Sequence, residues 1–261
     1  MSMATIHPTA IVDPQAKLDG DVTVGPYAII GPHVTIGAGS DVQAHAFISG
    51  HTTIGQRCQI FPFACVGMKT QDLKFKEGDI TYAEIGDETV LREFSTVHLG
   101  TKPGEVTRVG QRCLVMAYCH IAHGCNVGND VIMSNLATLA GEVTIEDHAV
   151  LGGMAGVHQF CRVGTFAMIG GATKIRQDCP PYMVVDMTDD GPRVVGPNVV
   201  GLQRSGFAAE VRSALKEAFK LIYREGLNRT QALERIKYEV ADLPEVRRLV
   251  EFYQKSQRGV H

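Results

Sequence analysis

The sequence predicts a mainly β protein, a parallel β-helix of hexapeptide repeats followed by a small α-helical C-terminal domain. The first observation is a period of six, because every sixth residue from Ile6 to Val66 is aliphatic. The same frame resumes at Ile85 and continues, with one further break, to Ile175. The second observation is that glycine often follows the aliphatic residue, and a small residue usually stands four positions after it. These preferences are typical of hexapeptide repeats whose aliphatic and small residues point into a solenoid core. The third observation is a helical period of about 3.6 residues that begins near Phe207.

Residues 1–181 are therefore assigned to the β-helix. Three hexapeptides should close one triangular coil of about 18 residues, and residues one coil apart should stack about 4.8 Å apart. Glycine is expected to relieve crowding where the chain turns. Breaks in the frame predict excursion loops near 71–80 and 100–108. Such loops are candidate functional elements, although a tolerated insertion is the simpler interpretation. Pro180 and Pro181 should end the coil because consecutive prolines cannot donate to a ladder.

The C-terminal part divides into two segments. Residues 182–203 are expected to form an irregular connector, and residues 204–261 an α-helical domain. The first helix has an apolar face from about Phe207 and should end at Gly226. Asn228 and Gln231 fit a capping box that opens a second helix. Pro244 suits the first turn of a third helix.

Composition excludes several classes of protein. The 261 residues carry a net charge of −3, which gives no indication of a nucleic-acid partner. Hydrophobic residues make up 44 %, but no apolar run is long enough for a transmembrane helix. The N-terminal residues lack the charged and apolar segments of a signal peptide. We therefore expect a cytoplasmic protein.

The cysteines follow the repeat rather than the spacing of a metal site or a disulfide. Those on the small inward position of the frame are Cys58, Cys113, Cys119, Cys125, Cys161 and Cys179. We expect them to be reduced core residues and assign them neither a metal nor a disulfide.

A dense polar cluster interrupts the regular coils at His120 and His123. One coil after His123 comes Gly141, which should stack beside it. An imidazole there could take a proton from a hydroxyl, and the glycine N–H could hold an oxyanion. A surface histidine is the simpler interpretation. Zinc is a rival, because γ-class carbonic anhydrases resemble this fold and bind zinc through histidines, although they space those histidines differently.

Several stretches resemble one family of enzymes. These are Gln-Asp-Leu-Lys (71–74), His-Ile-Ala-His (120–123), Leu-Ala-Gly (139–141), Gly-Gly-Met-Ala-Gly-Val-His-Gln-Phe (152–160), Gly-Leu-Gln-Arg (201–204) and Phe-Lys-Leu-Ile-Tyr-Arg (219–224). They are similar to the hexapeptide-repeat UDP-N-acetylglucosamine O-acyltransferases, which open lipid A biosynthesis. The resemblance covers essentially the whole chain. It implies a left-handed β-helix, a homotrimer with sites between subunits, and no cofactor.

The resemblance also implies an activity and roles for residues. A 3-hydroxyacyl group would pass from acyl carrier protein to the 3-hydroxyl of a UDP-sugar. His123 would be the general base, and the backbone N–H of Gly141 would stabilise the oxyanion. Gly171 matches a position that limits acyl length, and glycine there implies a long acyl chain. The substrate-binding residues would be Asp72, Lys74, His98, His120, His158, Gln159, Asn198 and Arg204.

The chain departs from the family pattern at several positions. Gly124 stands where the family usually has Asp, and Glu142 stands where it often has His. Because these positions should stack on neighbouring coils, we hypothesise that Glu142 orients His123 or stabilises its charged form. Val200 and Ser205 replace an acidic and a basic residue that are usual near the nucleotide.

Three alternatives stay open at this point. The first is the same transfer to a 3-amino UDP-sugar, which would give an amide. The second is a zinc enzyme on the same fold, similar to the γ-class carbonic anhydrases. The third is a solenoid without catalytic activity that serves assembly.

Overall fold

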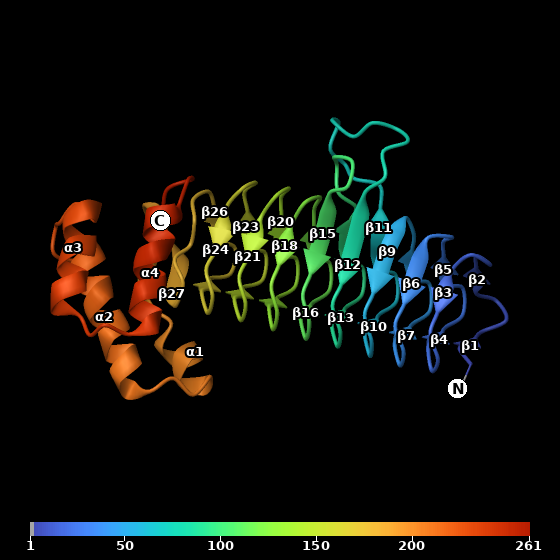
Figure 1. Ribbon diagram of the computed structural model, residues 1–261, viewed down its shortest axis with the longest axis horizontal. Coiled ribbons are helices and arrows are strands. Elements are labelled where there is room, and N and C mark those ends of the chain that lie inside the picture. The colour runs from blue at the N-terminus through green and yellow to red at the C-terminus, as the bar shows by residue number, and fades with distance from the viewer. Residues whose placement is uncertain (1–2) are drawn as a thin grey trace.

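A computed structural model describes residues 3–261. It is an elongated prism of short strands, with helices at its C-terminal end and the N-terminus at the other end (Figure 1). The strands form three sheets along the three sides of the prism. We call them sheets 1, 2 and 3 in the order in which the chain first enters them.

Sheet 1 consists of β1 (Thr5–Ile6), β4 (Thr23–Val24), β7 (Asp41–Val42), β10 (Gln59–Ile60), β13 (Val90–Leu91), β16 (Leu114–Val115), β19 (Ile132–Met133), β22 (Val150–Leu151), β25 (Met168–Ile169), β27 (Met183–Thr188) and β28 (Gly191–Pro197). Sheet 2 consists of β2 (Ile11–Val12), β5 (Ile29–Ile30), β8 (Phe47–Ile48), β11 (Cys65–Met68), β14 (Thr96–His98), β17 (His120–Ile121), β20 (Thr138–Leu139), β23 (Gly156–Val157) and β26 (Lys174–Ile175). Sheet 3 consists of β3 (Lys17–Leu18), β6 (Val34–Ile36), β9 (His51–Ile54), β12 (Tyr82–Ile85), β15 (Val106–Val109), β18 (Asn126–Val127), β21 (Thr144–Ile145) and β24 (Arg162–Val163).

Neighbouring coils are parallel and stack in the register that the repeat predicts. Ile121 pairs with Leu139, and Leu139 pairs with Val157. Each of these aliphatic side chains therefore lies on its counterpart in the next coil. Ile121 and Leu139 are fully buried, and burying a side chain of this size stabilises the fold by about 1.5–3 kcal/mol.

The cysteines on the inward frame are buried, as predicted. All seven cysteines of the chain are free thiols. Burial raises the pKa of Cys113 and that of Cys119 to about 11, so both thiols stay protonated near neutral pH. These thiols act as small apolar packing groups.

The sequence suggested that the glycines relieve crowding where the chain turns, but in the structure they relieve crowding between neighbouring coils. A Cβ at Gly110 would lie 2.4 Å from the carbonyl oxygen of Gly128 on the next coil. The crowding is therefore between coils. The left-handed turn falls two residues later and is occupied by other residue types, such as Tyr118 with φ 62° and Glu142 with φ 62°. A non-glycine residue in this conformation costs about 1–2 kcal/mol, which the packed coils must offset.

The expectation of an irregular connector was wrong. β27 and β28 form an antiparallel hairpin, and β27 also pairs in parallel with β25, so the hairpin extends sheet 1. Burial alternates along β27, with Met183 and Val185 buried. This alternation repeats every two residues, so the six-residue pattern of the coils did not predict it. The short helix α1 (Val199–Arg204) follows the hairpin.

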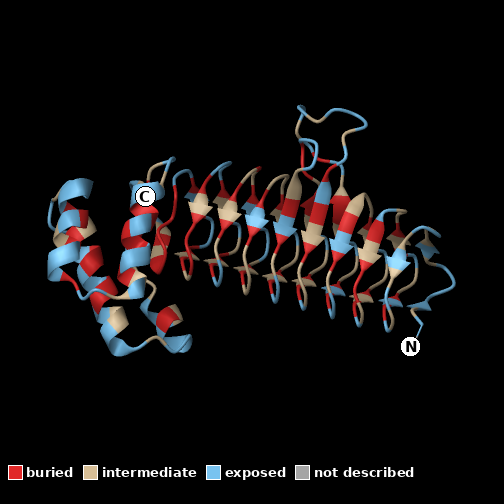
Figure 2. Ribbon diagram, viewed as in Figure 1, coloured by how far each residue is buried: buried red, intermediate tan, exposed pale blue. Residues whose placement is uncertain are grey.

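The predicted helices are α2 (Ala209–Tyr223), α3 (Arg229–Glu239) and α4 (Pro244–Lys255). The capping box is confirmed, because Asn228 accepts from the Gln231 N–H and Gln231 caps the N–H of Asn228. Pro244 opens α4 as predicted. The helices turn their apolar faces to one another and to the hairpin, and their outer faces are exposed (Figure 2). No helix within residues 3–261 is long and apolar enough to cross a bilayer.

The prism has three long edges, which we call corner 1–2, corner 2–3 and corner 3–1 after the sheets that they join. Both excursion loops leave corner 2–3: residues 69–81 join β11 to β12, and residues 99–105 join β14 to β15. The longer loop projects from the side of the prism (Figure 1). The second loop is shorter than the frame suggested, because β15 begins at Val106. Both loops therefore rise beside the next turns of the same edge, at residues 122–125 and 140–143.

Candidate active site

A cleft of about 590 Å³ lies on corner 2–3, between the longer loop and the coils that follow it. The residues of the sequence-predicted site that line it are Asp72, Lys74, His98, His120, His123 and Gln159. His98 ends β14, His120 begins β17, and His123 lies in the turn after β17. Successive coils therefore place the three imidazoles side by side.

The longer loop carries Asp72 to the histidines. Asp72 accepts a hydrogen bond from the Lys74 N–H at 3.0 Å, and its own N–H donates to Thr70 Oγ1 at 3.1 Å. The buried Thr70 and Thr101 hydroxyls lie 3.2 Å apart and join the two loops. The Lys74 N–H and then the nearby His123 lower the pKa of Asp72, so its carboxylate is ionised near neutral pH.

The Nε2 atom of His123 faces the cleft. It lies 3.6 Å from Asp72 Oδ2. The ring lies directly over Gly141, where a Cβ would be 2.3 Å from both Nε2 and Cε1. Any side chain at position 141 would therefore overlap the ring. The Gly141 N–H donates no hydrogen bond within residues 3–261. One stacked pair thus brings an imidazole nitrogen and an uncommitted N–H to the same place.

The opposite nitrogen of His123 is buried. Nδ1 has no hydrogen-bond partner in the described part of the chain. The carboxylate that faces it is that of Glu105, with Oε2 at 3.9 Å. Glu142, which we expected to orient His123, forms no ion pair with it among the described residues and instead pairs with Lys102 at 2.6 Å. The expected stacking of Gly124 and Glu142 occurs, but it does not bring the Glu142 carboxylate to the ring.

His98 and His120 are neutral neighbours of His123. Their ring centroids lie 4.8 Å apart in an edge-to-face arrangement. Burial, followed by the charges of His98 and His123, lowers the pKa of His120 to about 4. Thr96 Oγ1 lies 2.7 Å from His120 Nδ1, which leaves Nε2 for a substrate. Burial also lowers the pKa of His98.

The remaining predicted residues lie outside this cleft. His158 is exposed, and its Nδ1 lies 3.2 Å from the Arg258 guanidinium. Asn198 caps α1 by accepting from the Gly201 N–H at 3.1 Å, and it donates to the Phe166 carbonyl at 3.0 Å. Arg204 is exposed at the end of α1, and Gly171 lies on corner 1–2. A single chain therefore assembles only part of the predicted site.

Within residues 3–261 of one chain, no three His, Cys, Asp or Glu side chains are arranged to hold a metal ion. One residue beside His123, Glu105, was missed by sequence reasoning. It lies in the second excursion loop, where counting by coils gives no register. The signal that could have found it is its charge, within a loop that leaves the same edge as His123.

Comparison with known proteins decides the family. The family model of UDP-N-acetylglucosamine O-acyltransferase, domain 2, matches residues 178–261, and the bacterial transferase hexapeptide model matches residues 3–38. The acyl-[acyl-carrier-protein]–UDP-N-acetylglucosamine O-acyltransferase of Thiobacillus denitrificans is 49 % identical over 99 % of both chains. The chain belongs to the UDP-N-acetylglucosamine O-acyltransferase family. It is therefore an acyltransferase, and the open pair of His123 and Gly141 lies in an enzyme that moves acyl groups.

Solved structures of the family share the whole architecture. The UDP-N-acetylglucosamine acyltransferase of Francisella novicida has a TM-score of 0.94 at 37 % identity, covering 98 % of this chain and 93 % of that one. The enzyme of Bacteroides fragilis has a TM-score of 0.94 at 37 % identity, covering 98 % and 99 %. The predicted fold is thus confirmed: this acyltransferase is a left-handed parallel β-helix with a small helical C-terminal domain.

Proposed function

We propose that this acyltransferase moves a 3-hydroxyacyl group from acyl carrier protein to the glucosamine 3-hydroxyl of UDP-N-acetylglucosamine, the first step of lipid A biosynthesis. The names of the relatives supply the donor and acceptor classes. The observation that carries the mechanism is the placement of His123 Nε2 between the Asp72 carboxylate and the uncommitted N–H of Gly141.

In this mechanism the sugar hydroxyl enters between His123 Nε2 and Asp72. Nε2 removes the hydroxyl proton while the oxygen attacks the thioester carbonyl. The Gly141 N–H donates to the oxyanion of the tetrahedral intermediate. The intermediate then collapses, the carbon–sulfur bond breaks, and the imidazolium returns its proton to the departing thiolate. No cofactor is needed, because every proton moves through His123.

The other predicted site residues that line the cleft also have roles in this scheme. Asp72 and Lys74 hold the sugar. The neutral His120 offers Nε2, since Thr96 already engages Nδ1. His98 packs against His120 and supports it. Gln159 lines the same cleft and lies close to both substrates.

We also propose a cytoplasmic homotrimer in which a neighbouring subunit completes the site. Corner 1–2 carries an exposed aromatic stripe, in which the rings of Tyr27, His45, Phe63, Phe94 and Tyr118 stack in sequence. Tyr118 is 55 % exposed. A continuous exposed apolar surface favours a protein interface. Gly171 lies on the same corner, where it would shape the acyl slot of the adjacent subunit for a long chain.

Residues on other elements would reach the nucleotide from that subunit. The planar guanidinium of Arg204 suits a diphosphate. Asn198, whose amide already caps α1, would hold that helix in place. His158 would contribute from the surface beside Arg258.

The test is acyl transfer from 3-hydroxyacyl carrier proteins of several lengths to UDP-N-acetylglucosamine, with His123→Ala beside the parent. The parent should transfer and prefer long chains. The variant should lose about 10²–10⁴-fold in rate, the usual contribution of a general base. Transfer only to a 3-amino UDP-sugar would replace the proposed acceptor. Equal rates for parent and variant would contradict the proposed role of His123.

A further inference from the structure

We propose that Glu105, and not Glu142, is the positioning carboxylate that orients His123 and balances its charge during transfer. This inference rests on the proposed role of His123 as the general base. Glu105 faces Nδ1, the imidazole nitrogen that takes no proton from the sugar in the proposed transfer.

The two nitrogens of His123 have different surroundings. Nε2 faces Asp72 and Gly141, which is the substrate side. Nδ1 faces inward, is buried, and has no hydrogen-bond partner in residues 3–261. A buried polar nitrogen without a partner costs stability. The acidic oxygen that faces it is Glu105 Oε2, at 3.9 Å.

The second excursion loop holds the Glu105 carboxylate in place. The Thr101 N–H donates to Oε2 at 2.5 Å. The Glu105 N–H donates to the Lys102 carbonyl at 2.9 Å and closes the loop, while the Glu105 carbonyl accepts from the Tyr82 N–H of the adjacent strand at 2.9 Å. The Glu105 side chain is only 13 % exposed. The Thr101 N–H thus fixes the carboxylate, and the two backbone hydrogen bonds fix the residue that carries it. A carboxylate held in this way can orient a neighbouring ring.

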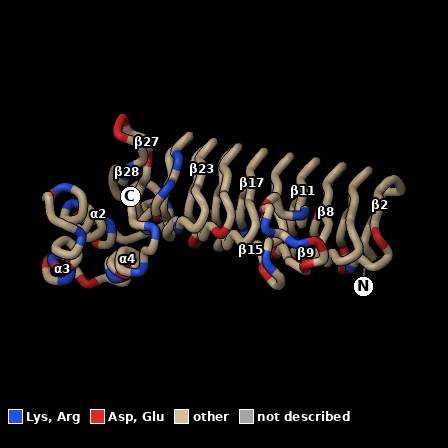
Figure 3. The backbone as a smooth tube through the Cα atoms, turned by 90° about the horizontal axis from the view of Figure 1, so that it is seen from above, with Lys and Arg blue, Asp and Glu red and all other residues tan. Residues whose placement is uncertain are grey.

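The Glu142 carboxylate binds Lys102 and not His123. Its Oε1 accepts from Lys102 Nζ at 2.6 Å. The same Nζ lies 3.6 Å from Glu105 Oε1, on the far side from the oxygen that faces His123. Acidic and basic residues gather on the loop beside β15 (Figure 3). Lys102 thus pairs closely with Glu142 and more loosely with Oε1 of Glu105, while Oε2 of Glu105 stays toward His123.

Gly124 provides the space for this arrangement. A Cβ at this position would lie 3.2 Å from Glu105 Cδ and 3.3 Å from Glu142 Cδ. Both contacts are tight, and φ at Gly124 is +64°, where side chains are strained. An acidic residue at position 124 and the carboxylate of Glu105 are therefore alternative occupants of the same space. Gly124 is also fixed, because its N–H donates to Thr107 Oγ1 at 3.0 Å.

The transfer step does not require Glu105 to take a proton. When Nε2 takes the sugar proton, the ring carries one positive charge, and its Nδ1–H points to a carboxylate that stays ionised. The 3.9 Å separation must shorten by about 1 Å, as contacts in unliganded active sites commonly do when substrate binds. The other charged or titratable neighbours are Asp72 on the Nε2 side, the buried His98 and the half-buried His120, whose imidazoles are neutral near pH 7.

The first test compares Glu105→Gln and Glu142→Gln with the parent in the transfer assay at fixed pH. Glu105→Gln should lower kcat at least about ten-fold, because the imidazolium loses a hydrogen bond to a charged group, with a smaller change in KM for the sugar. Glu142→Gln should lower kcat less. Glu84→Gln, which removes an ion pair with Arg108 outside the cleft, is the matched control.

The second test moves the carboxylate from one position to the other. Glu105→Ala should lower kcat and free the space beside Gly124. Adding Gly124→Asp to that variant should recover at least about ten-fold of the loss, because Asp tolerates the left-handed conformation better than most residues. Gly124→Asp alone should lower the rate, since both original carboxylates then crowd it.

The outcomes separate this inference from the proposed function. A parent-like kcat in folded Glu105→Gln would overturn the inference, and so would a larger loss of kcat in Glu142→Gln. If His123→Ala also kept the parent rate, the proposed function itself would fail. If His123→Ala lost activity while Glu105→Gln did not, only the role of Glu105 would fail.

Discussion

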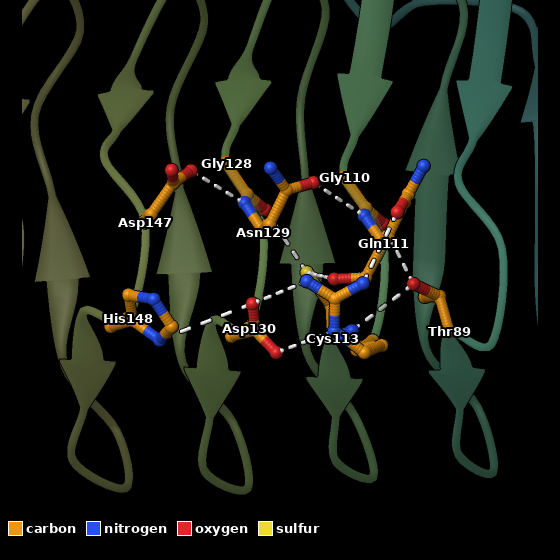
Figure 4. Close-up of polar contacts among 10 residues, drawn as sticks. Thr89, Gly110, Gln111, Cys113, Gly128, Asn129, Asp130, Asp147 and His148 are labelled. Atoms are coloured by element: carbon orange, nitrogen blue, oxygen red, sulfur yellow. Dashed lines mark hydrogen bonds and ion pairs between the residues drawn. The ribbon is translucent and has the colours of Figure 1, made fainter. Parts of the chain in front are cut away.

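Corner 3–1 and corner 2–3 have the same backbone geometry and use it in opposite ways. On corner 3–1, side chains of the next coil take up the N–H groups at the turns: the Gln111 N–H donates to Asn129 Oδ1 at 2.9 Å, and the Asn129 N–H donates to Asp147 Oδ1 at 2.8 Å (Figure 4). On corner 2–3 the equivalent position is Gly141, whose N–H has no partner within residues 3–261. The residue type on the next coil thus decides whether a turn N–H is bonded within the solenoid or left open.

The ion pairs follow the same division. On corner 3–1, Arg112 pairs with Asp130 at 2.8 Å, and the pair bridges two coils. On corner 2–3, Glu142 stands on a regular coil, but its partner Lys102 is brought by a loop that leaves the solenoid. Regular coils therefore supply the rigid frame, and the excursions supply groups that the repeat cannot hold.

The largest effect is expected from filling the space between Gly141 and the His123 ring. Gly141→Ala should lower transfer by about 10²–10⁴-fold, the usual contribution of a general base, because its Cβ would lie 2.3 Å from the His123 ring and displace the base. The measurement is kcat for transfer at fixed pH. Gly196→Ala is the control, since a Cβ there meets nothing within 4 Å. A parent-like rate in Gly141→Ala would show that transfer does not need the His123 ring to lie over Gly141.

A smaller loss is expected from the loop side of the cleft. Asp72→Asn should lower kcat/KM for the sugar by about 10–100-fold, because a hydrogen bond to a charged group contributes about 1.5–3 kcal/mol. The measurement is initial rate against sugar concentration. Glu77→Gln, on the same loop but paired with Lys69, should leave the rate unchanged. Equal losses in both variants would mean that the whole loop, rather than Asp72, acts on the substrate.

The neutral histidines should make stability depend on pH. The pKa of His120 falls from 6.5 to about 4 in the folded protein. The unfolded chain therefore binds a proton that the folded chain refuses, and stability falls as the pH drops from about 6.5 toward 4. His120→Gln should flatten the fall in Tm over this window relative to the parent. The exposed His7→Gln should keep the parent slope, and a parent slope in His120→Gln would contradict the assignment.

The smallest effect is expected on corner 3–1. Asn129→Ala should lower the free energy of unfolding by about 0.5–1.5 kcal/mol, because it removes the acceptor for the Gln111 N–H. Transfer activity should stay at the parent level. Chemical denaturation and the transfer assay measure the two quantities on one preparation. A loss of activity at constant stability would remove the distinction between the two corners.

The sequence was most informative where the repeat is regular. Adding one coil length to His123 reaches Gly141, because the aliphatic frame fixes the register of every regular coil. It failed at Glu105, because the loop 99–105 lies outside the frame and its side chains are placed by local turns. The partner expected for His123 was therefore Glu142, the residue that counting could reach. The hairpin of β27 and β28 was missed because its period is two, and α1 because it has only six residues.

The most direct test of the central claim is the tautomer of His123. Nitrogen NMR of protein with ¹⁵N-labelled histidine, assigned by the signals lost in His123→Ala, shows which ring nitrogen carries the proton near neutral pH. The account predicts a protonated Nδ1 facing Glu105 and an unprotonated Nε2 facing Gly141 and the sugar. A proton on Nε2 with UDP-N-acetylglucosamine bound would contradict it, because that nitrogen could not then act as the base.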